Sequence, residues 1–178
     1  IHLVWQTGEL FVEQADKIKS NFIHPLTFIS NMKEAYEMAD VVISRAGAIA
    51  ISEICIMGKA SVLVPLSTAA EDHQTKNAMA LANNQAAELV KDQDVKEHLD
   101  DTVIRLIDDK EKQTTISNNV KRMGLPMATI EIVNEIENYQ DSVKRIKLNI
   151  EKMSLPEKLR ARMVLKKYNE IIRSIKKH

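Results

Sequence analysis

The stretch of the sequence that decides the fold is ADVVISRAGAIAISE, residues 39–53. It contains an unbroken run of β-branched residues, Val41-Val42-Ile43, which is typical of a strand buried on both faces of a parallel sheet. The tight turn Arg45-Ala46-Gly47 follows, and residues 48–57 have the pattern of a helix that ends at Gly58. These residues therefore predict a strand, a turn and a helix in direct succession.

Alternating strands and helices surround this unit on both sides. The sequence predicts further strands over residues 2–6, 23–29, 61–65 and 87–90, and further helices over residues 9–20, 32–38 and 73–84. After residue 95 the pattern is purely helical, over residues 95–108, 111–123 and 127–139. Because strands that alternate with helices form βαβ units, we predict an α/β fold with a doubly wound parallel sheet.

Composition excludes several classes of protein. The chain has 178 residues, of which 44% are hydrophobic and 28% charged, so it is neither disordered nor collagen-like. It has one cysteine, Cys55, which lies among apolar residues and predicts an inert buried thiol in a reducing compartment. No apolar stretch is long enough to cross a membrane, and residue 1 is Ile, which suggests a piece of a longer protein.

Charge divides the chain into two parts. Residues 1–139 carry 13 Lys and Arg against 21 Asp and Glu, a net of −8, whereas residues 140–178 carry 12 against 4, a net of +8. We therefore predict a domain over residues 1–139 and a basic amphipathic helical tail over residues 140–178. Residues 141–178 could pack on the acidic domain or lie on an anionic membrane surface. Nucleic acid is the least favoured partner because no motif or interleaved aromatic residues accompany the charge.

One predicted strand end offers a site for an anion. In open α/β sheets, ligands bind outside the carboxyl ends of the strands. Gly47 allows close approach of a ligand to the backbone, and the amides of residues 48–50 are free at the start of the helix. Glu53, about 1.5 turns further on, could accept two hydrogen bonds from a vicinal diol such as a ribose. The alternative is a plain tight turn followed by a glutamate that the helix dipole favours.

Two other strand ends carry polar groups. Asp72 can cap the next helix, in which Gln74 and Asn77 share one face and could orient a sugar hydroxyl, or simply form a polar helix start. His73 in the same stretch is expected to be a surface residue and not a catalytic base. The backbone of Ile29, at the end of the second strand, could bind the edge of a planar base.

Motifs of other enzyme classes are absent from the sequence. It contains no G-x-G-x-x-G, P-loop, H-E-x-x-H or G-x-S-x-G pattern, and its histidines have no metal-ligand spacing. Aromatic residues make up only 4% of the chain, which argues against a stacking platform for single-stranded nucleic acid.

The stretch 39–53 resembles the donor-binding signature of the MurG family, bacterial enzymes that transfer N-acetylglucosamine to a lipid-linked N-acetylmuramyl-pentapeptide. Other stretches match that family in the same order over residues 1–139. They are Trp5-Gln6-Thr7-Gly8, Phe28-Ile29, Gly58-Lys59, Val64-Pro65, Asp72-His73-Gln74-Thr75-Lys76-Asn77-Ala78 and Thr129-Ile130-Glu131. The resemblance implies the Rossmann-like C-terminal domain of a GT-B glycosyltransferase, truncated at its N-terminus.

The resemblance also implies roles for individual residues. Ile29 is expected to contact uracil through its backbone, and Glu53 the ribose hydroxyls. Ala48, Ile49 and Ala50 are expected to hold a phosphate at the helix N-terminus, and Gln74 with Asn77 to contact the sugar. Arg45 and Gly47 in the preceding turn are expected to belong to the same donor-binding site. No tightly bound metal or other cofactor is expected, because helix amides replace a cation at the leaving group. No catalytic residue is expected in this chain, because the resemblance places the proposed base in the family's N-terminal domain.

The departures from the family limit this expectation. The acceptor domain and the glycine-rich loop before the first strand are missing, Ala46 and Ala50 replace Ser and Thr of many relatives, and residues 140–178 match nothing in the family. We therefore expect an inactive piece of an enzyme that is peripheral to the cytoplasmic face of the bacterial inner membrane. The alternatives are a GT-B transferase with another acceptor and a donor-binding subunit that serves a separate partner chain.

Overall fold

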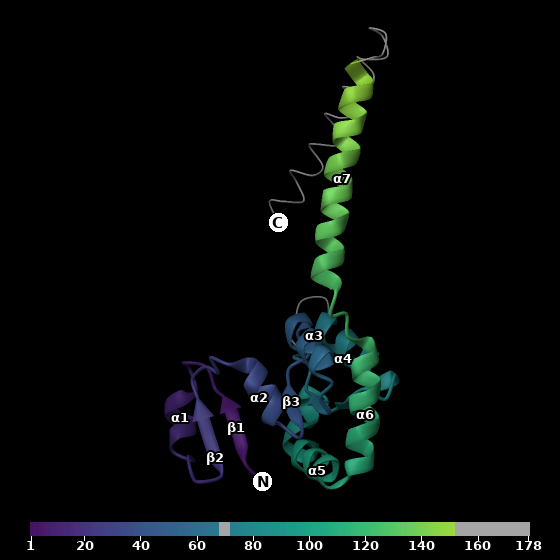
Figure 1. The fold of residues 1–178 in the computed structure, drawn as a ribbon. Coiled ribbons are helices and arrows are strands. Elements are labelled where there is room, and N and C mark those ends of the chain that lie inside the picture. The colour runs from purple at the N-terminus through teal and green to yellow at the C-terminus, as the bar shows by residue number, and fades with distance from the viewer. Residues whose placement is uncertain (68–71, 152–178) are drawn as a thin grey trace. The chain divides into compact units, whose positions relative to one another are not determined.

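The computed structural model describes residues 1–67 and 72–151 (Figure 1). Its strands are β1 (Leu3–Gln6), β2 (Ile23–Leu26), β3 (Val42–Ser44), β4 (Ser61–Leu63) and β5 (Glu88–Leu89). Its helices are α1 (Val12–Asp16), α2 (Met32–Met38), α3 (Ala48–Met57), α4 (His73–Asn83), the 3₁₀ turn η2 (Asp92–Asp94), α5 (Val95–Asp108), α6 (Lys110–Met123) and α7 (Ala128–Glu151). The chain divides into two compact units, Ile1–Leu125 and Pro126–His178, and α7 belongs to the second.

All strand pairs are parallel, which confirms the predicted α/β fold, but the strands form two sheets. β1 pairs with β2, and the second sheet has the order β3-β4-β5. Doubly wound folds have the strand order 3-2-1-4-5-6. In that order β2 and β1 take positions 3 and 2, and β3, β4 and β5 take positions 4, 5 and 6. No strand in residues 1–67 or 72–151 takes position 1. The unpaired side of β1 accordingly leaves Leu3, Val4 and Trp5 exposed.

β4 is the centre of the core. Ser61, Val62 and Leu63 are all fully buried. Leu63 belongs to a cluster that includes α3 and α4 residues, whereas Val62 belongs to a second cluster with Leu106 of α5. Helices therefore cover both faces of this strand, as an apolar run without alternation predicts.

β3 is buried less than the sequence predicts. Val41 and Val42 pack against opposite core clusters, but Ile43 is 42% exposed. The reason is the position of β3 at the edge of its sheet, where pairing with β4 protects only one side.

Helix boundaries agree closely in the middle of the chain and less well at its ends. The helix predicted over residues 95–108 is α5 exactly, whereas that predicted over 9–20 shrinks to the five residues of α1. Leu10 and Ile18, two apolar residues within the predicted range, are exposed, so burial does not support a longer helix. α7 continues through residues 139 and 140, and the domain boundary there stays a prediction. Residues 152–178 of the predicted tail lie outside the described residues.

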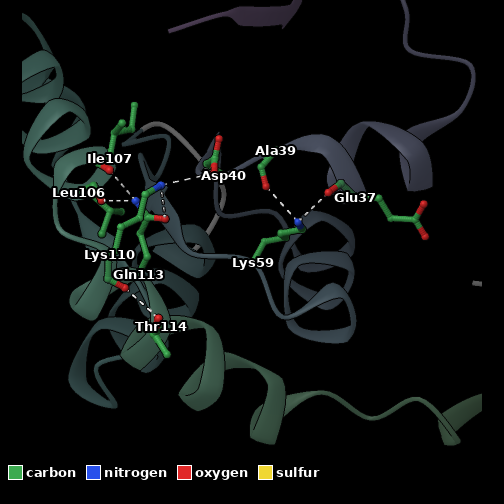
Figure 2. Close-up of polar contacts among 9 residues, drawn as sticks. All are labelled: Glu37, Ala39, Asp40, Lys59, Leu106, Ile107, Lys110, Gln113 and Thr114. Carbon is green, nitrogen blue, oxygen red and sulfur yellow. Dashed lines mark hydrogen bonds and ion pairs between the residues drawn. The ribbon is translucent and has the colours of Figure 1, made fainter.

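Side-chain bonds to backbone carbonyls fix two corners of the first unit (Figure 2). Gln113 Nε2 donates to the carbonyls of Leu106 at 2.7 Å and Ile107 at 2.8 Å, so it holds the end of α5 against α6. Lys59 Nζ donates to the carbonyls of Glu37 at 3.1 Å and Ala39 at 2.9 Å, at the end of α2. A cation suits this position because carbonyls at a helix C-terminus carry partial negative charge.

We expect Gln113→Met to lower the free energy of unfolding by about 1–3 kcal/mol, because it leaves two carbonyls at a buried corner without their donor. Thr114→Val is the matched control. The Thr114 hydroxyl is exposed and donates to the Lys110 carbonyl of its own helix, so its loss should cost less than about 0.5 kcal/mol. Urea unfolding followed by circular dichroism measures both, and equal effects of the two substitutions would contradict the assignment.

Candidate functional site

The parallel sheet β3-β4-β5 brings three chain segments to one edge. Each strand runs in the same direction, so the turn after Ser44, the loop after Leu63 and the segment after Leu89 all begin at the carboxyl edge. This is the edge at which open α/β sheets bind ligands. The predicted residues 45–53, Gln74 and Asn77 all belong to elements that meet there.

The turn before α3 presents an uncovered helix N-terminus. Gly47 is the N-cap residue, and no side chain caps the helix. A Cβ on Gly47 would meet no atom within 4 Å, so the space in front of the turn is open within the described structure. The side chain of Ile49 in the first turn is 78% exposed. Within the described residues, the amides of Ala48, Ile49 and Ala50 make no hydrogen bond, which leaves them to an anion.

The Glu53 carboxylate receives a hydrogen bond from a buried tyrosine. The Tyr36 hydroxyl, in α2, donates to Glu53 Oε2 at 3.1 Å, and Glu53 itself is partly exposed. Burial, followed by the hydrogen bond and the charge of Glu53, raises the pKa of Tyr36 to about 12, so its hydroxyl keeps its proton at neutral pH. Sequence reasoning missed Tyr36, because its ring resembles any other core residue of an amphipathic helix.

The amides of α4 bind the backbone of neighbouring segments. Gln74 Oε1 accepts a bond from the Leu66 amide at 2.9 Å, and Asn77 Nδ2 donates to the Ala46 carbonyl at 3.2 Å. Within the described residues, Gln74 Nε2 and Asn77 Oδ1 make no hydrogen bond, so each amide keeps one group for a ligand. Asp72 occupies the predicted N-cap position in a left-handed conformation, but its side chain makes no capping bond.

Arg45 links all three segments at the carboxyl edge. Its Nη1 donates to the Val64 carbonyl at 3.3 Å and forms an ion pair with Asp92, which follows β5. Asp92 also accepts a bond from the Ser67 hydroxyl at 3.1 Å. The bond from Arg45 is the main cause that lowers the pKa of the Asp92 carboxyl below its ordinary value. Asp92 and Ser67 were not predicted, since nothing in their local sequence indicates a partner near residue 45.

Ile29 lies at the carboxyl end of the other sheet. Its amide donates to Gln6 Oε1 at 2.9 Å, and Gln6 is the last residue of β1. The group that was predicted to bind a base is thus held by a side chain of the neighbouring strand. Ile29 and Gln6 thus follow strands of the β1-β2 sheet, whereas the other predicted site residues follow β3 and β4.

Two classes of site have no counterpart in the described parts of the chain. Residues 1–67 and 72–151 contain no group of three or more His, Cys, Asp or Glu side chains placed to hold a metal ion. Among the helices of these residues, none has the length and hydropathy needed to cross a membrane.

Comparison with known proteins identifies relatives of this architecture. Residues 1–132 match the family model described as the glycosyltransferase family 28 C-terminal domain. A curated relative from Cytophaga hutchinsonii is 45% identical over 136 residues, which are 76% of this chain and 37% of the relative. A relative from Porphyromonas gingivalis is 42% identical over 151 residues, 82% of this chain and 39% of the relative. Both are called UDP-N-acetylglucosamine--N-acetylmuramyl-(pentapeptide) pyrophosphoryl-undecaprenol N-acetylglucosamine transferase.

Solved structures give the same result. The crystal structure of MurG from Acinetobacter baumannii matches with a TM-score of 0.70 and 29% identity, and covers 78% of this chain and 41% of that one. The glycotransferase of kitacinnamycin matches at 20% identity with a TM-score of 0.54, which indicates a shared fold. The chain spans about two fifths of the length of the curated relatives it matches.

The ion pair of Arg45 with Asp92 predicts how stability depends on pH. Because the folded-state pKa of Asp92 is depressed, its contribution is present above the ordinary aspartate pKa of about 4 and is lost as pH falls through the lower folded value. Asp92→Asn should therefore lower the melting temperature near neutral pH and have little effect at the acid end. Thermal unfolding between about pH 7 and pH 2 measures the difference.

Asp101→Asn is the matched control, because Asp101 is exposed on α5 and its carboxylate makes no hydrogen bond within the described residues. Its effect on the melting temperature should stay small at every pH. An Asp92→Asn effect that is equal at both ends of the pH range would show that the ion pair does not stabilise the edge.

Proposed function

The chain belongs to the family of the glycosyltransferase family 28 C-terminal domain, and on that premise we propose that it binds the UDP-N-acetylglucosamine donor of an inverting glycosyltransferase. The acceptor in this proposal is lipid-linked N-acetylmuramyl-pentapeptide, as in the names of the relatives from C. hutchinsonii and P. gingivalis. The acceptor would bind to a part of the enzyme outside residues 1–178. The observation that carries the proposal is the uncovered N-terminus of α3, with Glu53 in the same helix.

The start of α3 is suited to a diphosphate. Three backbone amides and the helix dipole favour negative charge there. In an inverting transfer, the acceptor hydroxyl gives its proton to a base and attacks the anomeric carbon, while the bond from that carbon to the diphosphate oxygen breaks; in this proposal the base belongs, like the acceptor site, to a part of the enzyme outside residues 1–178. The departing diphosphate gains negative charge, and fixed amide donors stabilise it without the need to reorganise. Arg45 in the same turn is paired with Asp92, so the amides and the helix dipole supply the attraction in this proposal.

Glu53 is the residue that we assign to the ribose. It lies five residues after Ala48, so the two positions are about 7.5 Å apart along the helix axis. A carboxylate can accept hydrogen bonds from both hydroxyls of a diol. The two ends of one rigid helix segment would thus contact the two adjoining parts of a nucleoside diphosphate.

The remaining contacts extend this arrangement to the sugar and the base. Gln74 Nε2 and Asn77 Oδ1 are the amide groups that we assign to the N-acetylglucosamine hydroxyls. We assign the uracil edge to the Ile29 backbone. For the Ile29 amide to donate to the base, the Gln6 side chain must release it or share it.

The membrane surface is the second partner that we propose. The acceptor is a lipid, so the enzyme would act at the cytoplasmic face of the bacterial inner membrane. The net charge of +8 over residues 140–178 suits anionic headgroups, since each Lys or Arg near such a surface contributes about 1 kcal/mol. Nucleic acid is not a partner in this proposal.

Two substitutions test the donor site in binding titrations of the intact gene product. For each variant, the affinities for two ligands, UDP and 2′,3′-dideoxy-UDP, are measured. Glu53→Ala should weaken UDP binding about 10- to 100-fold, because a hydrogen bond to a charged group contributes roughly 1.5–3 kcal/mol. It should leave the affinity for the dideoxy ligand nearly unchanged, since that ligand has no diol to lose.

Gly47→Val is the matched variant at the other end of the helix segment. Its side chain fills the open space in front of the amides, so both ligands should bind more weakly by the same factor. Gly47 has a φ of −68°, which valine adopts without strain, and the fold should survive. If Glu53→Ala weakens both ligands equally, or neither, the ribose assignment is wrong.

The tail should bind anionic vesicles in a salt-dependent manner. We expect the 178-residue chain to sediment with vesicles that contain phosphatidylglycerol at low salt and to be released as salt is raised. Deletion of residues 141–178 should abolish sedimentation. Equal partitioning of the two chains would show that the tail is a packing element.

A further inference from the structure

The bond between Tyr36 and Glu53 joins a rigid group to a flexible one. The Tyr36 ring is only 7% exposed and belongs to the core cluster that contains Ala46, Ile54 and Cys55. Its hydroxyl reaches out of this cluster to Glu53 Oε2, 3.1 Å away on the next helix. A glutamate side chain has three rotatable bonds, and a partly exposed one samples many rotamers unless a contact selects one. The core thereby fixes the direction of a carboxylate at its border.

The geometry leaves part of the carboxylate available. Glu53 Oε1 makes no hydrogen bond within the described residues, and Oε2 accepts only the bond from Tyr36. Because a carboxylate offers about four lone-pair sites, it can accept further bonds from a diol while Tyr36 stays in place. The tyrosine keeps its proton at neutral pH, so its hydroxyl can donate this hydrogen bond there.

We propose that Tyr36 is a positioning residue for the nucleotide donor: its hydroxyl holds the Glu53 carboxylate in the orientation that accepts the ribose hydroxyls. This inference rests on the proposed donor-binding function. In this arrangement, a core residue of α2 orients the carboxylate through which α3 contacts the ribose. Pre-organisation of this kind improves affinity because less rotamer freedom is lost on binding.

Tyr36→Phe tests the proposal, because phenylalanine retains the ring that packs in the core and removes only the hydroxyl. In the intact gene product, UDP binding should weaken about 3- to 10-fold, the effect expected when one rotamer-rich side chain must be ordered on binding. Binding of 2′,3′-dideoxy-UDP should not change. In steady-state assays the KM for the donor should rise while kcat stays nearly constant, because the bond acts on the bound nucleoside and not on the reacting carbon.

A double-mutant cycle separates positioning from general stability. In a Glu53→Ala background, Tyr36→Phe should cause no further loss of UDP affinity, since the carboxylate that it orients is gone. A loss that persists in that background, or one that affects UDP and the dideoxy ligand equally, overturns the inference in favour of a structural role for Tyr36. Circular dichroism confirms that each variant is folded.

The same measurements distinguish failure of this inference from failure of the proposed function. If Glu53→Ala abolishes the preference for UDP over the dideoxy ligand and Tyr36→Phe leaves that preference intact, the positioning role is wrong and the ribose site stands. If Glu53→Ala itself leaves the preference intact, the ribose assignment fails and the role of Tyr36 fails with it.

Discussion

The complete burial of β4 is the constraint on which the rest of the first unit depends. Its three residues have no exposed surface, so both faces must be covered by helices and both edges by parallel strands. Because these strands are parallel, their carboxyl ends lie at the same edge of the sheet, and the segment that follows each strand begins there. The part of the candidate site that follows β3 and β4 is thus a consequence of the core, whereas Ile29 belongs to the other sheet.

The polar side chains at that edge have a structural duty as well as the ligand-binding one we propose. Arg45 binds Val64 and Asp92, Gln74 binds the Leu66 amide, and Asn77 binds the Ala46 carbonyl. Each of these bonds provides a partner for a polar group at the carboxyl edge, and each holds a chain segment that follows a strand. The described parts of these connections are therefore held before any ligand arrives, which pre-organises this part of the site.

The sequence predicted local structure well and pairings between distant residues poorly. The run Val41-Val42-Ile43 and the helix over residues 95–108 follow from patterns of adjacent residues, which hydrophobic periodicity reports directly. The bonds of Tyr36 to Glu53 and of Arg45 to Asp92 span 17 and 47 residues. Their partners depend on how helices pack and where strands end, which periodicity does not contain. The division of the strands into two sheets was missed for a different reason, since no strand in residues 1–67 or 72–151 takes the position that joins the two halves of a doubly wound sheet.

The glycines separate the requirements of the fold from those of the proposed ligand. Gly58 ends α3 in the left-handed conformation, with φ +63°, and a side chain there would be strained whatever space surrounded it. Gly47 has a φ that any residue adopts, and a Cβ on it would meet no neighbouring atom. The described structure therefore gives a reason for glycine at position 58 and none at position 47. A ligand that must approach the backbone at the start of α3 supplies that reason, and this is how a diphosphate would bind there.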